Sequence, residues 1–170
     1  MGCGDFVKVE IMRDTKYLFP DNYETVKITD FKGAYSGQLP ISDESDEIKV
    51  LINDTLKNCK VYDYATEEYS SIYNLNKINS HDKYDIYLSG ATPILTIENP
   101  EYEGTKELIV FRDSYGSSLI PLLATGYSKI TVVDTRYISP KLLSQFIEFK
   151  NQDVLFIYST LVINNSTALK

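Results

Sequence analysis

Three continuous apolar runs, each followed by polar residues, constrain the fold of this chain more than any other feature. They lie at 106–114, 129–137 and 153–159. Unbroken apolar runs are typical of strands that are covered on both faces of a sheet. Segments with helical spacing of apolar residues separate the runs, at 114–127 and 139–151. This order predicts an α/β fold in which right-handed crossovers join the strands into a parallel sheet.

The two helical segments carry signals for their ends. The first has Pro121 within its early turns, where proline is tolerated best, and Gly126 at its end. The second has Ser139 at the N-cap position and Pro140 in its first turn. Its apolar stripe consists of Leu142, Leu143, Phe146 and Ile147.

The residues before 105 carry weaker signals. We expect one domain over 1–170, N-terminally truncated, with a less regular half at 1–104 and a β-α-β-α-β core at 105–160. A turn signal separates the strands expected at 48–52 and 59–64, which predicts a hairpin-like pair. The remaining expected elements are strands at 7–12, 25–28 and 85–90, a strand or extended connection at 93–100, and a loop at 31–40.

The net charge and the small number of Cys and His residues argue against nucleic-acid-binding and metal-binding sites. The formal net charge is −7 and no basic patch is present, so we expect no nucleic-acid partner. The acidic run at 42–48 lacks the ligand spacing and turn glycine of an EF-hand loop, and we interpret it as a solvated loop. Two cysteines, Cys3 and Cys59, and one histidine are too few for a zinc site. They allow at most one disulfide, and we expect neither a metal nor a cofactor.

Tyrosine is abundant, with 14 residues, and tryptophan is absent. Tyrosine packs well in strands, which is the simpler interpretation of this number. Tyrosine-rich surfaces also line polar ligand sites, including sugar sites, so that use stays open. No apolar stretch reaches the ~18–20 residues of a membrane span, and we expect no transmembrane segment in this chain.

Polar residues follow all three buried runs. In a parallel sheet the carboxyl ends of the strands share one edge, and ligands bind beyond that edge. We therefore expect these side chains to converge on a candidate site. They are Asp113 and Ser114 after the first run, Asp134, Thr135 and Arg136 after the second, and Ser159 and Thr160 after the third.

Two interpretations of this site remain open from the residues alone. Ser114 at a helix start could be a nucleophile, but it needs a base. His81, followed by Asp82, lies near the amino end of an expected strand, which is the wrong edge, and a solvated loop histidine is the default. Alternatively, Asp113 and Ser114 only cap the helix, and the Asp134–Arg136 pair is a surface ion pair of little energetic weight.

The run LIVFRDSYGSSLIPLLATGYSKITVVDTRY, followed by DVLFIYS, resembles the DHHW family of bacterial envelope proteins. The shared features are a D-S-Y motif after a strand, a helix with S-x-x-P-x-L character and an I-x-x-V-D-x-R-Y strand. FKGAYSG and DKYDIYLSGATPILTI resemble upstream segments of the family, so the resemblance covers roughly residues 23–160. The family is similar to SGNH hydrolases, including the acetyltransferase-like proteins of alginate modification.

The resemblance implies a three-layer α/β/α sandwich with a mainly parallel sheet. It implies esterase or O-acyltransfer chemistry on a cell-surface glycan or an acyl-bearing small molecule, in the cell envelope or outside the cell. Were the chain complete, with no export signal, we would expect it in the cytoplasm. Ser114 is the counterpart of the nucleophile, with Asp113 beside it in the catalytic group. The residues expected around them are Gly116, whose N–H joins that of Ser114 in an oxyanion hole, together with Tyr115, Asp134, Arg136 and Ser159.

The chain departs from the family pattern where acid and base are needed. It has no tryptophan and no His-His pair, so the Asp-His-His-Trp motif is absent. Ala91-Thr92 precede Pro93 where polar or histidine-bearing residues are expected, and Ser159 replaces an expected asparagine. We therefore expect this chain alone to be nearly inactive. The alternative is a non-catalytic glycan-binding or scaffolding module of the cell envelope.

Overall fold

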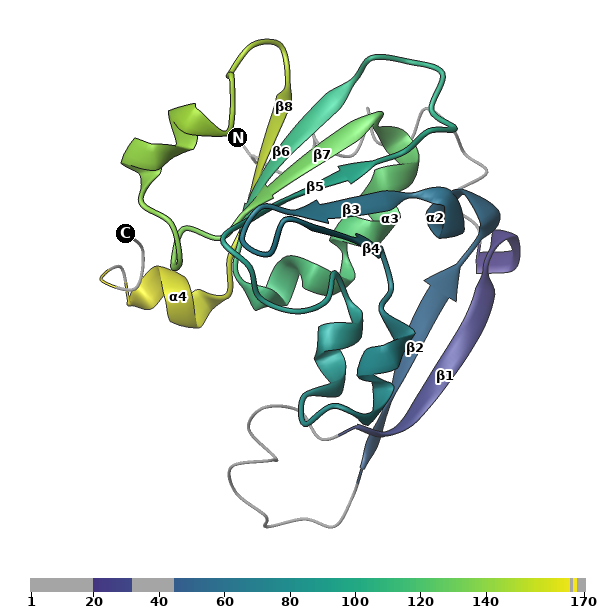
Figure 1. The fold of residues 1–170 in the computed structure, drawn as a ribbon. Coiled ribbons are helices and arrows are strands. Elements are labelled where there is room, and N and C mark those ends of the chain that lie inside the picture. The colour runs from purple at the N-terminus through teal and green to yellow at the C-terminus, as the bar shows by residue number, and fades with distance from the viewer. Residues whose placement is uncertain (1–19, 32–44, 166, 168–170) are drawn as a thin grey trace, which may run out of the picture. The chain divides into compact units, whose positions relative to one another are not determined.

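The computed structural model describes residues 20–31, 45–165 and 167 (Figure 1). The chain divides into two compact units, Met1–Asp54 and Thr55–Lys170, and each is described by itself. The strand expected at 7–12, Cys3 and nearly all of the loop expected at 31–40 lie outside the described residues, as does any disulfide of Cys3. None of the helices among the described residues is long and apolar enough to cross a membrane.

The first unit contains a two-stranded antiparallel sheet. After the short 3-10 helix η3 (Pro20–Asn22), β1 (Glu24–Phe31) pairs with β2 (Asp46–Ile52). The expected strands at 25–28 and 48–52 are thereby confirmed. The predicted hairpin of 48–52 with 59–64 is wrong, because β2 pairs with β1 instead.

The second unit is built on a six-stranded sheet in the order β4-β3-β5-β7-β6-β8 (Figure 1). The short helix α2 (Asp54–Asn58) precedes it, and α4 (Thr160–Asn164) follows it. The expected strand at 59–64 is confirmed, and of the two alternatives for 93–100 the structure has the strand. Strands are also present in all three apolar runs after 105. The bounds are β3 Lys60–Asp63, β4 Glu68–Ser71, β5 Ile94–Glu98, β6 Glu107–Arg112, β7 Lys129–Val133 and β8 Asp153–Ile157.

The sheet is mixed, whereas the expectation was a mainly parallel one. β6 pairs in parallel with β7 and with β8, as predicted for the core at 105–160. β3 pairs antiparallel with β4 and β5, and β5 pairs antiparallel with β7. A short turn at 64–67 joins β3 to β4, and a connection that short permits only antiparallel pairing. The α/β class is therefore confirmed, with a mixed sheet.

The helix predicted at 114–127 is replaced by three short pieces. They are η6 (Ser114–Ser118), α3 (Ile120–Leu123) and η7 (Ala124–Gly126). Gly116, Leu119 and Leu122 each donate a backbone hydrogen bond to the residue three positions earlier, which is the 3-10 pattern. Pro121 has no N–H and sits at the start of α3, so a longer helix cannot run through it.

The amphipathic helix predicted at 139–151 is also a shorter 3-10 element, η8 (Pro140–Gln145). Leu143 and Ile147 of its expected stripe are buried, but Leu142 and Phe146 are 44% and 41% exposed. The buried pair packs on one face of the sheet. The cluster there consists of Ile94, Ile109, Phe111, Val133, Ile138, Leu143 and Ile147, with Tyr64 and Tyr158 packed against it.

The strand predicted at 85–90 is wrong. Asp82 caps the 3-10 helix η5 (Lys83–Ile86) by accepting a hydrogen bond from the Tyr84 N–H. Of the following residues, Tyr87 makes only an isolated bridge to Tyr73. Leu88, Ser89 and Gly90 then have positive φ angles, which no strand allows. Another 3-10 helix, η4 (Leu75–Asn79), lies in the polar stretch before η5.

The connections of β6 and β7 diverge at their carboxyl ends. From β6 the chain passes through η6, α3 and η7 to β7, on one side of β6. From β7 it passes through η8 to β8, on the other side of β6. The strand order thus reverses at β6 and β7, and in open α/β sheets such a reversal opens a crevice for ligands.

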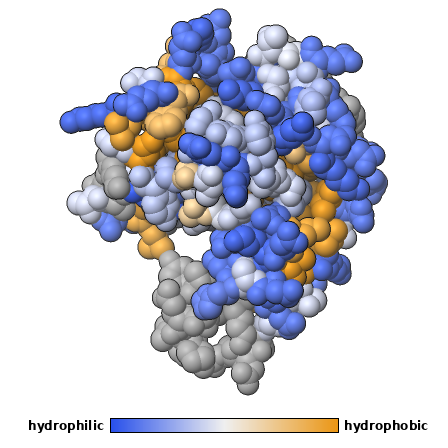
Figure 2. Space-filling model, in the orientation of Figure 1, coloured by the Kyte–Doolittle hydropathy of each residue, from blue (hydrophilic) through white to orange (hydrophobic). Residues whose placement is uncertain are grey.

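The side of the molecule drawn in Figure 2 is mostly hydrophilic, with hydrophobic areas between. Edge strand β8 contributes exposed apolar side chains, because Val154 and Phe156 are 49% and 66% exposed. Phe156 nevertheless stacks on Phe111 of the neighbouring strand, with ring centroids 4.8 Å apart. The prediction that the strands after residue 105 are buried on both faces therefore holds for β6 and β7 but not for β8.

Cys59 gives a direct test of burial in the second unit. Its side chain is 3% exposed, and burial, with a smaller effect of Glu101, raises the thiol pKa to about 12. In a Cys3→Ser variant at pH 8 we expect iodoacetamide to leave Cys59 unmodified, because little thiolate forms and access is blocked. Intact mass should show one adduct after unfolding in guanidinium and none before. An adduct on the folded protein would contradict this burial.

Candidate functional site

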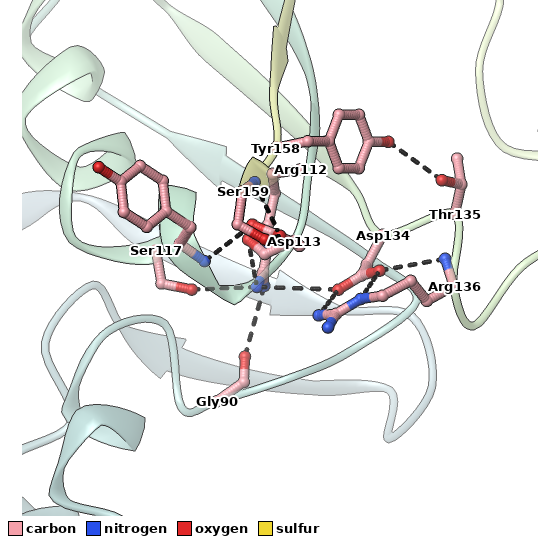
Figure 3. A network of polar contacts seen from close by, with 10 residues as sticks. Gly90, Arg112, Asp113, Ser117, Asp134, Thr135, Arg136, Tyr158 and Ser159 are labelled. Carbon is pink, nitrogen blue, oxygen red and sulfur yellow. Dashed lines mark hydrogen bonds and ion pairs between the residues drawn. The ribbon is translucent and has the colours of Figure 1, made fainter. Parts of the chain in front are cut away.

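Asp113 ties the end of β6 to the segment after β8 (Figure 3). Its carboxylate is 2% exposed and caps η6, since Oδ1 accepts from the Tyr115 N–H at 2.9 Å. Oδ2 accepts from the Ser159 N–H at 3.0 Å and from the Ser159 Oγ at 2.6 Å. Ser159 in turn caps α4 by accepting from the Val162 N–H. The capping role that the sequence left open for Asp113 is thus present, and its carboxylate is fully engaged in it.

Arg112 is a component of the site that the sequence reasoning missed. Its side chain is 0% exposed, although it ends a strand of apolar residues. Nη1 donates to Ser117 Oγ at 3.0 Å and to the Asp113 carbonyl at 3.5 Å, and Nη2 donates to the Gly90 carbonyl at 3.4 Å. The available signal was a charged residue within an otherwise continuous buried run, because such a residue must find partners inside the protein.

Asp134, at the carboxyl end of β7, balances the charge of Arg112. It is 0% exposed, and its Oδ2 lies 4.0 Å from Arg112 Nη1. Arg136 holds the same carboxylate with two side-chain hydrogen bonds, Nε to Oδ1 at 2.9 Å and Nη2 to Oδ2 at 2.6 Å. The interpretation of Asp134–Arg136 as a surface pair is therefore wrong, because the carboxylate lies in the interior between two guanidinium groups.

These charges shift the pKa values of the two arginines in opposite directions. Burial lowers the pKa of Arg112, while nearby Asp134 raises it and Arg136 lowers it further. The hydrogen bonds from Arg136 to Asp134 raise the pKa of Arg136. The Arg112 Nε is buried without a hydrogen-bond partner, so desolvation of this guanidinium is compensated only in part.

The loop at 88–90 reaches this network through a strained backbone. Gly90 has a φ angle of 104°, and its carbonyl accepts from Arg112. A Cβ at Gly90 would meet Asp85 Oδ1 at 2.7 Å, so glycine is required both by conformation and by space. Leu88 and Ser89 are held by the Leu88 N–H to Ile72 carbonyl bond and by Asn74 Nδ2 donating to Ser89 Oγ.

Ser114 is exposed at the start of η6, immediately after the fixed Asp113. Tyr115 beside it is 70% exposed. Within the described residues, no hydrogen bond of the Ser114 hydroxyl is found, and none joins it to the exposed His81. In the described part of the chain, the Ser114 hydroxyl is therefore exposed at the strand-order reversal and is not hydrogen-bonded to a base.

Gly116 has a structural use that competes with its expected oxyanion role. Its N–H donates to the Asp113 carbonyl at 3.2 Å within the turn. A Cβ at this position would lie 3.2 Å from the Arg112 Cβ, so the glycine lets η6 approach β6 closely. The Ser114 N–H has no such partner among the described residues and is the better-placed donor of the two.

All seven expected site residues lie at this edge, and six of them are joined by hydrogen bonds or ion pairs. Asp113, Ser159, Gly116 and Tyr115 are joined by the hydrogen bonds described above, and Asp134 and Arg136 join them through Arg112. Ser114 is placed there by its position in η6 alone. Thr135 Oγ1 and Tyr158 OH form a further hydrogen bond of 3.0 Å beside the network. The part of the chain that the structure describes contains no group of three or more His, Cys, Asp or Glu residues placed to hold a metal ion.

Solved structures share this fold. A DHHW family protein from Eubacterium siraeum matches with a TM-score of 0.65 and 22% identity, over 89% of this chain and 51% of that one. Bacillus cereus PatB1, solved with a sulfonyl adduct, matches with a TM-score of 0.59 and 15% identity, over 89% of this chain and 50% of that one. The resemblance to a DHHW protein thus holds at the level of the fold, and this chain spans about half the length of both neighbours.

Sequence comparison adds only a short local match. Thiazole synthase from Clostridium beijerinckii is 73% identical over 30 residues, which is 18% of this chain and 12% of that protein. Thiazole synthase from Clostridioides difficile is 66% identical over 29 residues, or 17% and 11%. The chain therefore spans only a small part of these relatives. No family model matches it.

Replacing Asp134 by Asn tests whether this buried carboxylate holds the site together. The variant removes the carboxylate that is paired with the buried Arg112 guanidinium, so we expect a loss of about 3–5 kcal/mol in the free energy of unfolding. Urea denaturation measures the loss. Glu148→Gln, which affects only an exposed pair with Lys150, is the matched control and should unfold as the parent does. Equal stability of Asp134→Asn and the control would contradict the assigned role.

Asp113→Ala tests the tie between β6 and α4. It removes the acceptor of three donors in a buried place, so we expect a loss of roughly 2–4 kcal/mol. Ser159→Ala removes one of those donors and should cost less, about 1 kcal/mol. If the two variants were equally stable, the capping and bridging bonds would not carry the energy that we assign to them.

Proposed function

We propose that this chain is the serine-bearing part of an SGNH-like esterase or O-acyltransferase that acts on cell-surface polysaccharide, and that it is incomplete as a catalyst by itself. The observation that carries the proposal is the position of Ser114. Its exposed hydroxyl follows β6 at the strand-order reversal, directly after a residue that three hydrogen bonds hold in place. A nucleophile needs such fixed geometry to approach the face of a carbonyl group in the correct orientation.

The chemistry follows from that position. Ser114 Oγ bonds to the carbonyl carbon of an acyl ester and gives up its proton to a base, and the bond to the leaving alcohol then breaks as the alcohol takes up a proton. Water or an acceptor hydroxyl removes the acyl group in the second half of the reaction. The Ser114 N–H stabilises the oxyanion of the intermediate. Gly116 contributes only if its N–H leaves the Asp113 carbonyl.

Asp113 has a positioning role in this proposal and does not act as the acid or base. Its two carboxylate oxygens already accept from Tyr115 and Ser159, and it is almost fully buried. The base is missing from the described residues around Ser114, and loss of triad members in a serine hydrolase costs on the order of a million-fold in rate. We therefore assign the chain alone a very low activity.

The structural neighbours support the proposal through their fold. The envelope location that we propose rests on the resemblance of the sequence to the DHHW family, and the DHHW protein from Eubacterium siraeum supports that resemblance through its fold. PatB1 carries a sulfonyl adduct, and sulfonylating reagents react with activated nucleophiles. Both chains are about twice as long as the part matched here, which leaves room in them for residues that this chain lacks.

A second candidate is a non-catalytic glycan-binding module. The specific observation in its favour is the exposure of Tyr115 and Tyr137, at 70% and 50%, beside the charged network. Arg136 lies over the Tyr137 ring, 5.3 Å from its centroid. Reactivity of Ser114 distinguishes this candidate from the first.

Rescue by an external base tests the reactivity of Ser114. We expect a fluorophosphonate to leave the chain unmodified in plain buffer and to add one adduct in the presence of imidazole, because imidazole supplies the missing base. Intact-mass spectrometry measures the adduct. Ser114→Ala should abolish it, while Ser144→Ala, a change of another exposed serine, should retain it.

Two outcomes would overturn parts of this proposal. An adduct on Ser114 without imidazole would show that the chain already holds a base. No adduct under either condition would show that Ser114 is only part of the helix start, and would favour the glycan-binding candidate.

A further inference from the structure

An open depression of about 550 Å³ lies over the antiparallel strands β3, β4 and β5 of the second unit's sheet, away from Ser114. Lys60, Tyr69, Ser70, Ser71 and Glu98 line it. Its place follows from the strand register, because Lys60 on β3 is directly paired with Ser71 on β4 and with Glu98 on β5. Three neighbouring strands therefore contribute to one polar patch.

Aromatic rings continue from this depression along the same face. Tyr69 is paired with Tyr62, which lies two residues after Lys60 and so on the same side of the sheet. The Tyr62 ring is 4.9 Å from that of Tyr69 and 5.0 Å from that of Tyr64. Tyr64 then meets Phe146, just after η8, at 5.6 Å. The four rings form an aromatic ladder: Tyr69, Tyr62, Tyr64 and Phe146.

The ladder is accessible at the depression. Tyr69 is 71% exposed, and Phe146 at the other end is 41% exposed. The rings support one another by edge and tilted contacts, which limits their movement and lowers the entropy lost when a ligand binds. Such a surface is preorganised to bind a ligand that packs on the faces of aromatic rings.

The lining selects the class of ligand. An ammonium, a carboxylate, two serine residues and a phenol surround the depression, so it offers both donors and acceptors. Lys60 and Glu98 are side by side and their charges offset each other, which does not favour an anion. A neutral carbohydrate fits this combination, since its C–H faces pack on aromatic rings and its hydroxyls both donate and accept.

This depression is separate from the candidate catalytic edge. Glu98 is paired with Lys129, the first residue of β7, and Lys129 is paired with Glu107, the first residue of β6. The depression therefore lies at the level of the amino ends of β6 and β7, whereas Ser114 follows the carboxyl end of β6. In addition, β5 and β7 stand between β3 and β6 in the sheet.

We propose that the Lys60–Glu98 depression and the adjoining aromatic ladder form a binding site for a neutral oligosaccharide, distinct from the Ser114 site. The site does not depend on catalysis by Ser114. Through this site the chain would bind a polysaccharide at a distance from the serine. Such binding is compatible with both proposed functions, the esterase and the glycan-binding module.

Titration with short neutral sugars tests the site. Chitotriose, cellotriose and xylotriose are added separately to the ¹⁵N-labelled chain, and amide shifts are followed by NMR. We expect at least one sugar to shift residues of β3, β4 and the end of β5 in a saturable manner. Tyr69→Ala should weaken that binding about tenfold, and Tyr69→Phe should retain most of it, because the ring face remains.

The controls separate this proposal from the role of Ser114. Phe149→Ala removes another exposed aromatic ring, 55% exposed, and should bind as the parent does. Ser114→Ala should also bind unchanged. The proposal is overturned if no sugar binds, if the shifts centre on residues 113–118, if Ser114→Ala abolishes binding, or if Tyr69→Ala binds as tightly as the parent.

Discussion

The buried guanidinium of Arg112 is the constraint on which the second unit's functional edge depends. It contacts η6 through Ser117, the loop at 88–90 through Gly90, and β7 through Asp134. A charge removed from water must be balanced where it lies, so each of these segments has to take one position relative to β6. Gly90, with its positive φ, supplies a carbonyl acceptor to this side chain, and Gly116 lies where a Cβ would be 3.2 Å from the Arg112 Cβ.

Ser114 gains its position from this arrangement without taking part in it. The residues on either side are anchored, since Asp113 accepts three hydrogen bonds and the Tyr115 N–H donates one of them. The serine side chain points out of a turn whose backbone is fixed. A rigid backbone that carries a free hydroxyl is the arrangement that the proposed nucleophile requires.

The sequence predicted the local elements well wherever a single segment determines them. The apolar runs at β5, β6 and β7 identify strands because burial on both faces leaves no polar positions. Strand pairing was harder, since β2 pairs with β1 and β3 with β4 through contacts that no periodicity encodes. Both expected helices are replaced by short elements. In the first, the cap at Asp113 and Pro121 favour a 3-10 turn and a one-turn α-helix over a continuous α-helix, and the second is the 3-10 helix η8.

The candidate site shows the same division between local and distant information. The convergence of Asp113, Asp134 and Ser159 followed from the rule that carboxyl ends of parallel strands share an edge. The role of Arg112 could not be inferred from that rule, because its partners Gly90 and Asp134 lie 22 positions earlier and 22 positions later in the chain. The signal in the sequence was the charge itself, because a charged residue inside a buried run must have partners within the protein.

The charges of the network explain how a serine can stay positioned without its base. Arg112 and Arg136 face Asp134 and Asp113, so two positive groups meet two negative ones, and the balance is reached inside this chain. Nothing in that balance requires a histidine. The frame that orients Ser114 is therefore energetically independent of the group that would activate it, and geometry and activation can be separated by experiment. In the proposed reaction, an external base then acts on a serine that the protein has already placed.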